Sequence, residues 1–375
     1  MAGFDVAVVG LGAMGSAALD AVARRGLRAV GIERFEPGHN RGSSHGETRI
    51  IRLSYFEHPS YVPLVREAYR LWRDIETRSG QTLLHVTGII EIGPPDGPLV
   101  RGTLQSSRRH VLPHAVLDAA ALMQRWPAFR VPSHVVGVFQ PDGGFLAAEP
   151  AVHAQVKLAA AAGAAIRTGE TVQVIEPRGQ GVRIHTDRGT IDAAKAIIAA
   201  GPWLTTLISD LAVPLNVTRQ VIGWFEPAEK TLFSMEEFPV FILESRHGMH
   251  YGFPLYGRSG VKVAKHHHRD TPVDPEAYDC TVADDDERLI RSALADHVPA
   301  ADGRLLAATT CLYTNTPDGD FILDCLPSHP AIIIASPCSG HGFKFAPVVG
   351  QILADLAQTG STARDISRFR LARFG

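Results

Sequence analysis

The sequence contains few cysteines and no long hydrophobic run. Its four cysteines show no Cys-x-x-Cys spacing, and without a signal-peptide pattern they are expected to be reduced, buried thiols rather than disulfides. No apolar stretch approaches the roughly 20 residues that a membrane span requires. A formal net charge of −2 provides no basic surface for nucleic acid or anionic lipid. These absences favour a cytoplasmic protein that acts on small molecules.

The composition is that of a globular protein with a substantial core. Of the 375 residues, 45% are hydrophobic and 20% are charged, which excludes extended disorder and suffices for two domains. The chain shows neither an internal repeat nor a low-complexity segment. Its organisation must therefore be inferred from hydrophobic periodicity and from turn residues.

The most informative stretch is an apolar run, residues 4–9, that breaks into three glycines and continues with helical character. The bare backbone at Gly10 and Gly12 would let a pyrophosphate approach the helix N-terminus, and Gly15 would let helix and strand pack closely. Glu33 ends the next apolar run, near the offset of an acid that binds ribose. This strand-turn-helix-strand pattern predicts dinucleotide binding rather than an ordinary βα turn, without separating NAD from FAD.

Two later apolar runs end in glycine in a similar way. Residues 195–200 form a predicted buried strand that ends at Gly201, and residues 331–335 form another that leads to Gly340, Gly342 and a helix. Each is a further point where a backbone could approach a phosphate or a carboxylate. The nucleotide-binding unit is therefore expected to be assembled from separate parts of the chain.

The remaining periodicity predicts helices over 60–78 and 149–162 and a short helix near 119–124. Prolines and short strand-like runs make 80–146 an inserted α+β segment, and strand-like alternation dominates 217–318. Three consecutive histidines begin at His266. Neighbouring strand residues point to opposite faces and no ligand-type residue follows at suitable spacing, so we predict no metal site there.

Three motifs together resemble the monomeric sarcosine oxidase and N-methyltryptophan oxidase family of FAD-dependent amine oxidases. They are Ser-His-Gly-Glu-Thr-Arg-Ile-Ile-Arg at 44–52, Thr-Cys-Leu-Tyr-Thr-Asn-Thr-Pro-Asp at 310–318 and Ser-Gly-His-Gly-Phe-Lys at 339–344. The likeness runs nearly end to end. It implies FAD rather than NAD, attached covalently through the thiol of Cys311. On composition alone, that cysteine would be an inert buried thiol.

The resemblance also implies which other residues form the site. Arg52 and Lys344 match the residues that hold the substrate carboxylate, a role suited to a guanidinium fork and an ammonium. Lys262 matches the lysine beside the flavin ring that promotes reaction with O₂. On the strand pattern alone, it could instead point to water. The further implied residues are Tyr251, His266 and Tyr313 around the substrate, and Arg34, Ser44, His45, Arg49, Val172 and Phe343 around FAD.

The resulting prediction is an α/β protein with a Rossmann-like FAD-binding domain (1–79, 147–216 and 319–375) and a β-sheet-based α+β substrate domain (80–146 and 217–318). Its expected activity is oxidation of a secondary amino acid to an imine with release of H₂O₂, and the family suggests a monomer. Pro337-Cys338 and the apolar stretch 53–56 depart from the family pattern and leave the substrate open. Two alternatives are an NAD(P)- or electron-carrier-linked dehydrogenase and a non-enzymatic flavin sensor.

Overall fold

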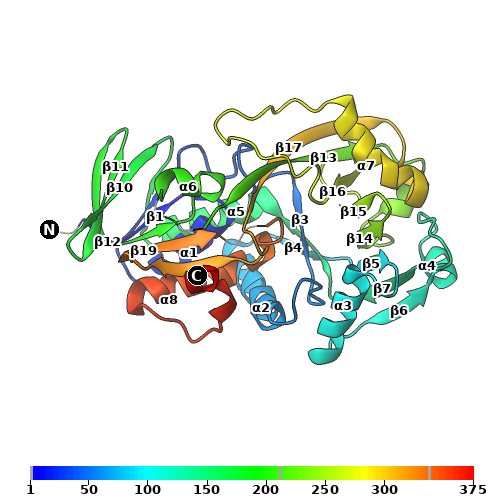
Figure 1. Ribbon diagram of the computed structural model, residues 1–375, viewed down its shortest axis with the longest axis horizontal. Helices are drawn as coiled ribbons and strands as arrows, with labels where there is room; N and C mark the ends of the chain where they lie inside the picture. The colour runs from blue at the N-terminus through cyan, green and yellow to red at the C-terminus, as the bar shows by residue number, and fades with distance from the viewer. Residues whose placement is uncertain (1–2, 210, 212, 337–338) are drawn as a thin grey trace.

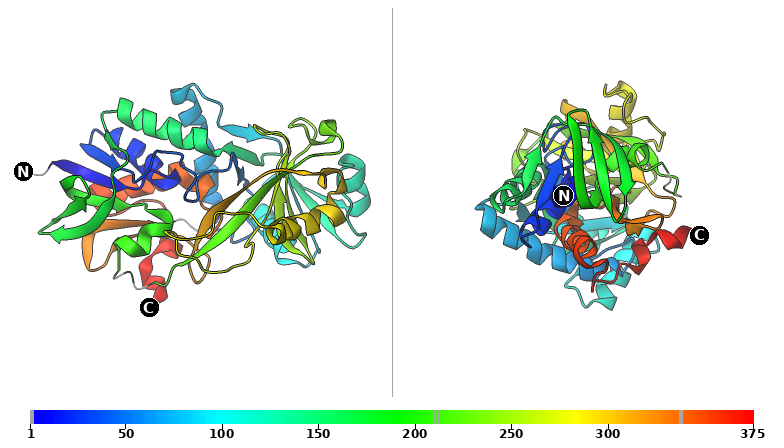
Figure 2. Two further views of the ribbon diagram at one scale, coloured as in Figure 1. Left: turned by 90° about the horizontal axis from the view of Figure 1, so that it is seen from above. Right: turned by 90° about the vertical axis from the view of Figure 1, so that its left-hand side faces the viewer.

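The computed structural model describes residues 3–209, 211, 213–336 and 339–375. The molecule is elongated, with two eight-stranded sheets towards opposite ends of its long axis (Figure 1). Both chain termini lie in the half that contains β1, and strands of a small third sheet, β3 and β4, lie near the middle. In the left view of Figure 2, the long strands β13 and β17 run from the first half of the molecule into the second.

The first sheet has a parallel centre in the order β9-β2-β1-β12-β19. The β10–β11 hairpin extends the early part of β12, and β18 pairs antiparallel with β19. Its strands are β1 (Phe4–Val9), β2 (Ala29–Ile32), β9 (Ala165–Arg167), β10 (Val172–Arg178), β11 (Gly181–Thr186), β12 (Gly189–Ile198), β18 (Ile322–Leu326) and β19 (His329–Ser336). The carboxyl ends of the parallel strands meet at one edge, where ligands bind in such sheets.

Four long helices pack with this sheet, and a core cluster joins their apolar stripes to side chains of β1, β12 and β19. They are α1 (Ala13–Ala23), α2 (Tyr61–Ser79), α5 (Ala148–Ala161) and α8 (Ala346–Thr359), and a short α6 (Leu204–Leu207) packs against β10. The predicted helices over 60–78 and 149–162 are thereby confirmed. No helix among the described residues is long and apolar enough to cross a membrane.

The geometry of the turn between β1 and α1 shows why each of its three glycines is needed. Gly10 has a φ of +86°, and a Cβ there would lie 2.6 Å from the carbonyl oxygen of Ala199. A Cβ on Gly15 would lie 1.7 Å from the carbonyl oxygen of Gly10, so α1 approaches the end of β1 only because this residue has no side chain. A Cβ on Gly12 would meet only the Ser44 hydroxyl, at 3.3 Å. The backbone at Gly12 is therefore the one left open to a ligand.

The second sheet has the order β17-β13-β16-β15-β14-β5-β7-β6. Its strands are β5 (Ile89–Gly93), β6 (Ala115–Asp118), β7 (Val136–Gln140), β13 (Asn216–Phe225), β14 (Val240–Ser245), β15 (Gly248–Gly252), β16 (Val261–Lys265) and β17 (Leu305–Asn315). One face packs on α4 (Ala119–Arg125) and α7 (Asp284–His297). The other face packs on α3 (Pro98–Arg109) and the third sheet, β3 (Thr48–Ile51), β4 (Leu84–Val86) and β8 (Gly144–Ala147).

Three features differ from the sequence-based expectations. Residues 195–200, expected to form a strand of their own, largely belong to the second half of a longer strand, β12 (Gly189–Ile198), whose two halves pair with different partners. Helix α3 lies in 80–146, expected to be α+β with a single short helix near 119–124, and helix α7 lies in 217–318, which was assigned mainly to strands. Both carried start signals: Pro98 stands at the first position of α3, and four acids open α7 at 284–287. The proposed domain boundaries remain a prediction.

Short 3₁₀ helices complete the fold. They are η1 (Gly201–Trp203), η2 (Lys230–Phe233), η3 (Pro299–Ala301), η4 (Phe343–Phe345), η5 (Ser367–Phe369) and η6 (Leu371–Phe374). Of these, η1 and η4 follow β12 and β19 at the carboxyl edge of the first sheet. They bring Gly201, Phe343 and Lys344 to the region where β1 turns into α1.

Candidate active site

A cavity of about 440 Å³ lies at the carboxyl edge of the first sheet and extends to β17 and the second sheet. It collects most of the residues that the sequence singled out, although they come from widely separated segments. Those that line it are Gly10, Gly12, Glu33, Arg34, Ser44, Arg49, Arg52, Val172, Gly201, Tyr251, His266, Cys311, Tyr313, Gly340, Gly342, Phe343 and Lys344. Gly15, His45 and Lys262 do not line it.

The nucleotide end of the cavity is built around Glu33. Its carboxylate accepts hydrogen bonds from the backbone N–H groups of Leu11 (2.7 Å) and Phe35 (3.0 Å), which fixes it at the end of β2. The hydroxyl of Ser44 accepts from the Ala13 N–H (3.1 Å) at the start of α1. A fixed acid facing a glycine turn at a helix N-terminus fits the ribose and pyrophosphate of a dinucleotide.

Three further residues at this end were not predicted. His39 and Trp203 line the cavity, with ring centroids 6.4 Å apart. Glu276, from the loop after β16, also lines it and pairs with Arg34 through a bond from Nη2 of 2.9 Å. Trp203 lies two residues after Gly201, the predicted strand end, and this position could have indicated it. Nothing in the sequence pairs Arg34 with a residue 242 positions later.

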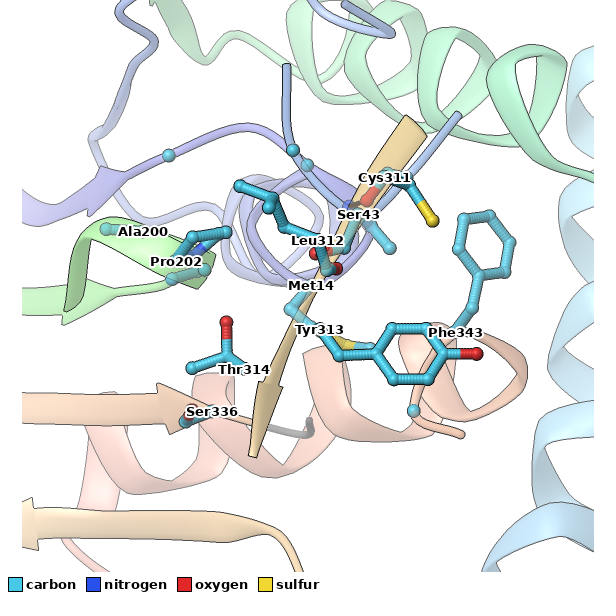
Figure 3. Close-up of a pocket in the computed structure, with 18 of the residues that line it drawn as sticks. Met14, Ser43, Ala200, Pro202, Cys311, Leu312, Tyr313, Thr314, Ser336 and Phe343 are labelled. Atoms are coloured by element: carbon cyan, nitrogen blue, oxygen red, sulfur yellow. Dashed lines mark hydrogen bonds between the residues drawn. The ribbon is translucent and has the colours of Figure 1, made fainter. Parts of the chain in front are cut away.

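Cys311 and Tyr313 lie two residues apart on β17, so their side chains share one face of the strand. Figure 3 shows both directed towards Phe343. The Cys311 thiol is free and buried, and burial raises its pKa. Gly340, with a φ of +78°, lies against Tyr313: a Cβ there would be 2.4 Å from its ring.

Arg49 and His45 come from the loop that leads into β3. The Arg49 guanidinium donates to the carbonyls of Ser43 (2.7 Å) and Thr48 (2.8 Å), so it holds the loop closed while lining the cavity. His45 is buried beside it. Burial and the Arg49 charge lower the pKa of His45 to about 3, which makes its ring neutral.

Arg52 is almost fully buried, at 2% exposure, and lies between the rings of Tyr55 and Phe56, with its Cζ atom 4.3 and 4.5 Å from their centroids. Its Nη1 donates to the Ser54 carbonyl (2.9 Å), and its Nη2 donates to both oxygens of Glu57 (2.8 and 2.6 Å). Glu57 also lines the cavity. Burial opposes its ionisation, but the Arg52 charge lowers the pKa of Glu57 to about 2.

Lys344 lies in η4 at the same end of the cavity. Its Nζ donates to the carbonyl oxygen of His341 (2.6 Å), and its own carbonyl accepts from the indole of Trp72 (2.9 Å). Burial and the nearby Arg52 charge lower the pKa of Lys344 to about 7. His341 is a lining residue that the sequence analysis did not select, although it lies within a quoted motif.

Tyr251, Tyr313 and His266 form an uncharged wall of the cavity. The Nδ1 atom of His266 and the Tyr313 hydroxyl are 3.3 Å apart. Burial lowers the pKa of His266 to about 3 and raises that of Tyr251 to about 12. Near neutral pH the imidazole is therefore unprotonated and the phenol keeps its proton.

Lys262 is buried on β16, at 3% exposure, so the alternative in which it points to water is wrong. Its Nζ donates to the carbonyls of Gly46 (2.6 Å) and Thr48 (2.8 Å) and to the Thr48 hydroxyl (2.9 Å). Burial and the Arg49 charge lower its pKa well below the usual value. The ammonium thus lies directly behind the loop that carries Arg49.

The wall around Arg52 is more apolar than the predicted residues suggest. Ile50, Phe56, Ile242, Met249 and Phe253 all line the cavity. Only Phe56 of these belongs to the stretch 53–56 that the sequence marked as unusually apolar. The other notable departure, Pro337-Cys338, lies outside the described residues.

A βαβ nucleotide cradle continuous with a buried cationic pocket defines a nucleotide-dependent oxidoreductase. The chain belongs to the FAD dependent oxidoreductase family, which matches residues 5–356. It is 40% identical over 371 residues to monomeric sarcosine oxidase of Streptomyces avermitilis (strain ATCC 31267 / DSM 46492 / JCM 5070 / NBRC 14893 / NCIMB 12804 / NRRL 8165 / MA-4680), covering 98% of this chain and 96% of that one. The resemblance inferred from the three motifs is thereby confirmed.

Two further relatives support the same assignment. N-methyl-L-tryptophan oxidase of Salmonella typhi is 36% identical, with 99% of both chains covered. The solved structure of NikD, an amino acid oxidase essential for nikkomycin biosynthesis, superposes with a TM-score of 0.87 at 30% identity, covering 99% of this chain and 98% of that one. The predicted mixed α/β fold class is confirmed by this match.

Proposed function

We propose that this protein is an FAD-dependent oxidase of secondary amino acids, either N-methylated or cyclic, that forms an imine and hydrogen peroxide. The observation that carries the proposal is the buried pair Arg52 and Lys344, which lines the same cavity as the dinucleotide cradle. Two cations beside a cofactor site suit a substrate with a carboxylate. Bound FAD supplies the acceptor for two electrons from the C–H bond next to nitrogen.

The residues present fit FAD. Glu33 offers its carboxylate to the ribose, and the open backbone at Gly12 and the start of α1 offer N–H groups to the pyrophosphate. Cys311 is proposed as the covalent attachment point. In support, its thiol is free, lines the cavity and shares a strand face with Tyr313 (Figure 3).

Substrate binding is proposed to exchange one carboxylate for another on Arg52. Glu57 holds the Nη2 edge of the guanidinium inside the cavity. A substrate carboxylate that takes this edge would also meet Lys344, whose ammonium form is favoured by the added negative charge. The fork geometry of Arg52 would then fix the orientation of the amino acid.

The amine end of the substrate is proposed to face Tyr251, Tyr313 and His266. Because these side chains are neutral near pH 7, they place no positive charge beside the amine. A neutral amine with a free lone pair is the form that gives up hydride equivalents. The apolar wall that includes Phe56, Met249 and Phe253 supports a substrate with an apolar side chain.

Spectroscopy of the purified holoenzyme tests the proposal. Sarcosine, N-methyltryptophan, pipecolate and proline are mixed anaerobically with the protein, and at least one should bleach the flavin absorbance. Air should restore the colour with one equivalent of peroxide. Bleaching without peroxide would indicate a dehydrogenase, and a spectrum that no amine changes would indicate a sensor.

Acid precipitation tests the attachment separately. The yellow colour should remain in the pellet of the native protein and move to the supernatant for Cys311→Ser. Release of all colour from the native protein would exclude a covalent link while leaving the oxidase proposal standing. We also propose that the protein is cytoplasmic and monomeric. The similarity to monomeric sarcosine oxidase supports the monomeric state, which sedimentation of the holoenzyme would check.

A further inference from the structure

Glu91 is a fully buried carboxylate directly behind Arg52. It lies on β5 in the interior of the second sheet, opposite Val138 of β7 and Ile242 of β14, and is 0% exposed. One of its oxygens, Oε1, is 3.5 Å from Nε of Arg52. Glu91 does not line the cavity, so any effect on a ligand must pass through Arg52.

The position of Glu91 is one where the fold calls for an apolar side chain. Ile90 and Ile92 point into the core under α4 and α7, and Ile89 points into the opposite apolar cluster with Val240. Strand alternation puts Glu91 on the same face as Ile89. An ionised carboxylate there costs folding free energy unless it is paired and hydrogen-bonded.

The pairing of Glu91 is incomplete. By distance and angle, neither oxygen of Glu91 makes a hydrogen bond with another described residue, and the same holds for Nε of Arg52. The Thr103 hydroxyl lies close enough to help lower the pKa of Glu91, but it does not offset the effect of burial. Arg52 thus has two acidic neighbours with different geometry. Glu57 accepts short hydrogen bonds from Nη2 of Arg52 inside the cavity. Glu91 lies on the opposite side, near Nε of Arg52, and interacts with it by charge alone.

We propose that Glu91 is a positioning residue that sets the carboxylate affinity of the active site by partly neutralising Arg52 from behind. The inference rests on the proposed function, in which a substrate carboxylate replaces Glu57 on the guanidinium. When Glu57 leaves, the charge of Arg52 is shared between the substrate and Glu91. An ionised Glu91 therefore weakens the hold on the substrate, and a protonated Glu91 leaves the full charge available to it.

The surroundings make this charge variable near neutral pH. Burial raises the pKa of Glu91 to about 7, against the opposing effect of the Arg52 charge. The other ionisable groups that act on it are Glu57, from the loop before α2, and Lys344, from η4. Because the pKa of Lys344 is also about 7, a test must separate the titration of Glu91 from that of Lys344.

The test measures binding of methoxyacetate, the oxygen analogue of sarcosine, to the holoenzyme by calorimetry from pH 5.5 to 8.5. Glu91→Gln keeps the shape but removes the titration. We expect its affinity to match the native enzyme within twofold at pH 5.5 and to exceed it about five- to tenfold at pH 8.5. The same difference in affinity at pH 8.5 should appear between Lys344→Met and the double variant Glu91→Gln/Lys344→Met, because in both of these proteins residue 344 cannot titrate.

Three variants act as controls. Glu91→Asp keeps a titrating acid and should retain the native pH profile, and Glu91→Leu should match Glu91→Gln and replaces it if the glutamine variant does not fold. Parallel profiles for native enzyme and Glu91→Gln would overturn the role of Glu91, while weaker binding by Arg52→Ala would still support the proposed function. Unchanged binding by Arg52→Ala would reject both.

Discussion

Asp286 and Glu91 are both buried acids beside arginines, yet their surroundings are opposite. Asp286, in the first turn of α7, accepts bonds from Arg219 (3.2 and 2.9 Å), His268 (3.0 Å), Arg269 (3.3 Å) and the Ala283 N–H (3.1 Å). Glu91 has one charged neighbour at 3.5 Å and, by distance and angle, no hydrogen bond among the described residues, with only the Thr103 hydroxyl close by.

The two acids consequently differ in pKa. Burial acts to raise both, but the Arg219 bond and its companions hold the pKa of Asp286 well below its usual range, whereas that of Glu91 rises to about 7. A carboxylate whose lone pairs are all used joins β13, the loop after β16 and α7 as a structural clamp. The Glu91 carboxylate, by contrast, is incompletely paired and lies beside a cation that binds the ligand. It therefore adds little stability, and its charge can change with pH.

The largest expected effect is on the clamp. Asp286→Ala would leave the buried His268 and the half-buried Arg219 without their carboxylate partner, and we expect it to lower the free energy of unfolding by about 3–5 kcal/mol at pH 7. Denaturant titration of the holoenzyme measures this. Asp296→Ala, which removes a partly exposed acid near the end of the same helix, is the matched control and should cost far less, because water screens its ion pairs. Equal losses in the two variants would remove the distinction drawn for Asp286.

Lys262 is an exception to the rule that a fully hydrogen-bonded buried charge is structural. Its ammonium is as fully hydrogen-bonded as the Asp286 carboxylate, yet we propose that it promotes the reaction with O₂. We expect Lys262→Met to slow reaction of the reduced enzyme with O₂ by about 10²–10³-fold, the usual loss when one charge-stabilising group is removed. Reduction by substrate should change far less. Stopped-flow measurement of both half-reactions checks this, with the partly exposed Lys265→Met as control. Equal slowing of the two steps would make Lys262 structural.

Local motifs predicted one part of this site well and could not predict the other. Gly10, Arg52 and Cys311 were found because each lies in a short motif, and the structure brings all three to one cavity. The surroundings of these residues depend on contacts across the chain. The Ile-Ile-Glu-Ile sequence of β5 reads as an ordinary strand, and only the tertiary fold shows that Glu91 faces Arg52 from 39 residues away.

The same limit applies to secondary structure. Helix α7 was missed although four acids open it, because the strand-like alternation on either side dominated the interpretation of 217–318. The strand pattern alone left the burial of Lys262 open, because a Val-Lys-Val sequence suggests one solvated face, and only the family resemblance favoured a role beside the flavin. That face is instead covered by Trp224 and Phe253, whose ring centroids lie 5.9 and 4.5 Å from its Nζ.

A smaller effect should separate the two acids by the sign of their pH dependence. Folding raises the Glu91 pKa from 4.5 to about 7, so its contribution is full below pH 4.5 and is lost as pH rises through 7. Glu91→Gln should therefore gain stability over the native protein between pH 5 and 8, by at most about 3 kcal/mol. Asp286→Asn should instead lose stability throughout this range, because a depressed pKa stabilises above its unfolded value of 3.8. Thermal melts at several pH values would reveal whether the two trends really diverge.

The smallest effect is expected at the nucleotide end, where Arg34 and Glu276 form an ion pair whose side chains are 37% and 46% exposed. Water and salt screen such a pair, so Glu276→Gln should change the free energy of unfolding by less than about 1 kcal/mol, and 0.5 M NaCl should abolish the difference. The Arg34–Glu276 pair resembles the Arg219–Asp286 pair in its short bidentate contact, but its side chains are more exposed to water. A loss as large as that of Asp286→Ala would mean that bond geometry, and not burial, distinguishes the acids that stabilise this fold.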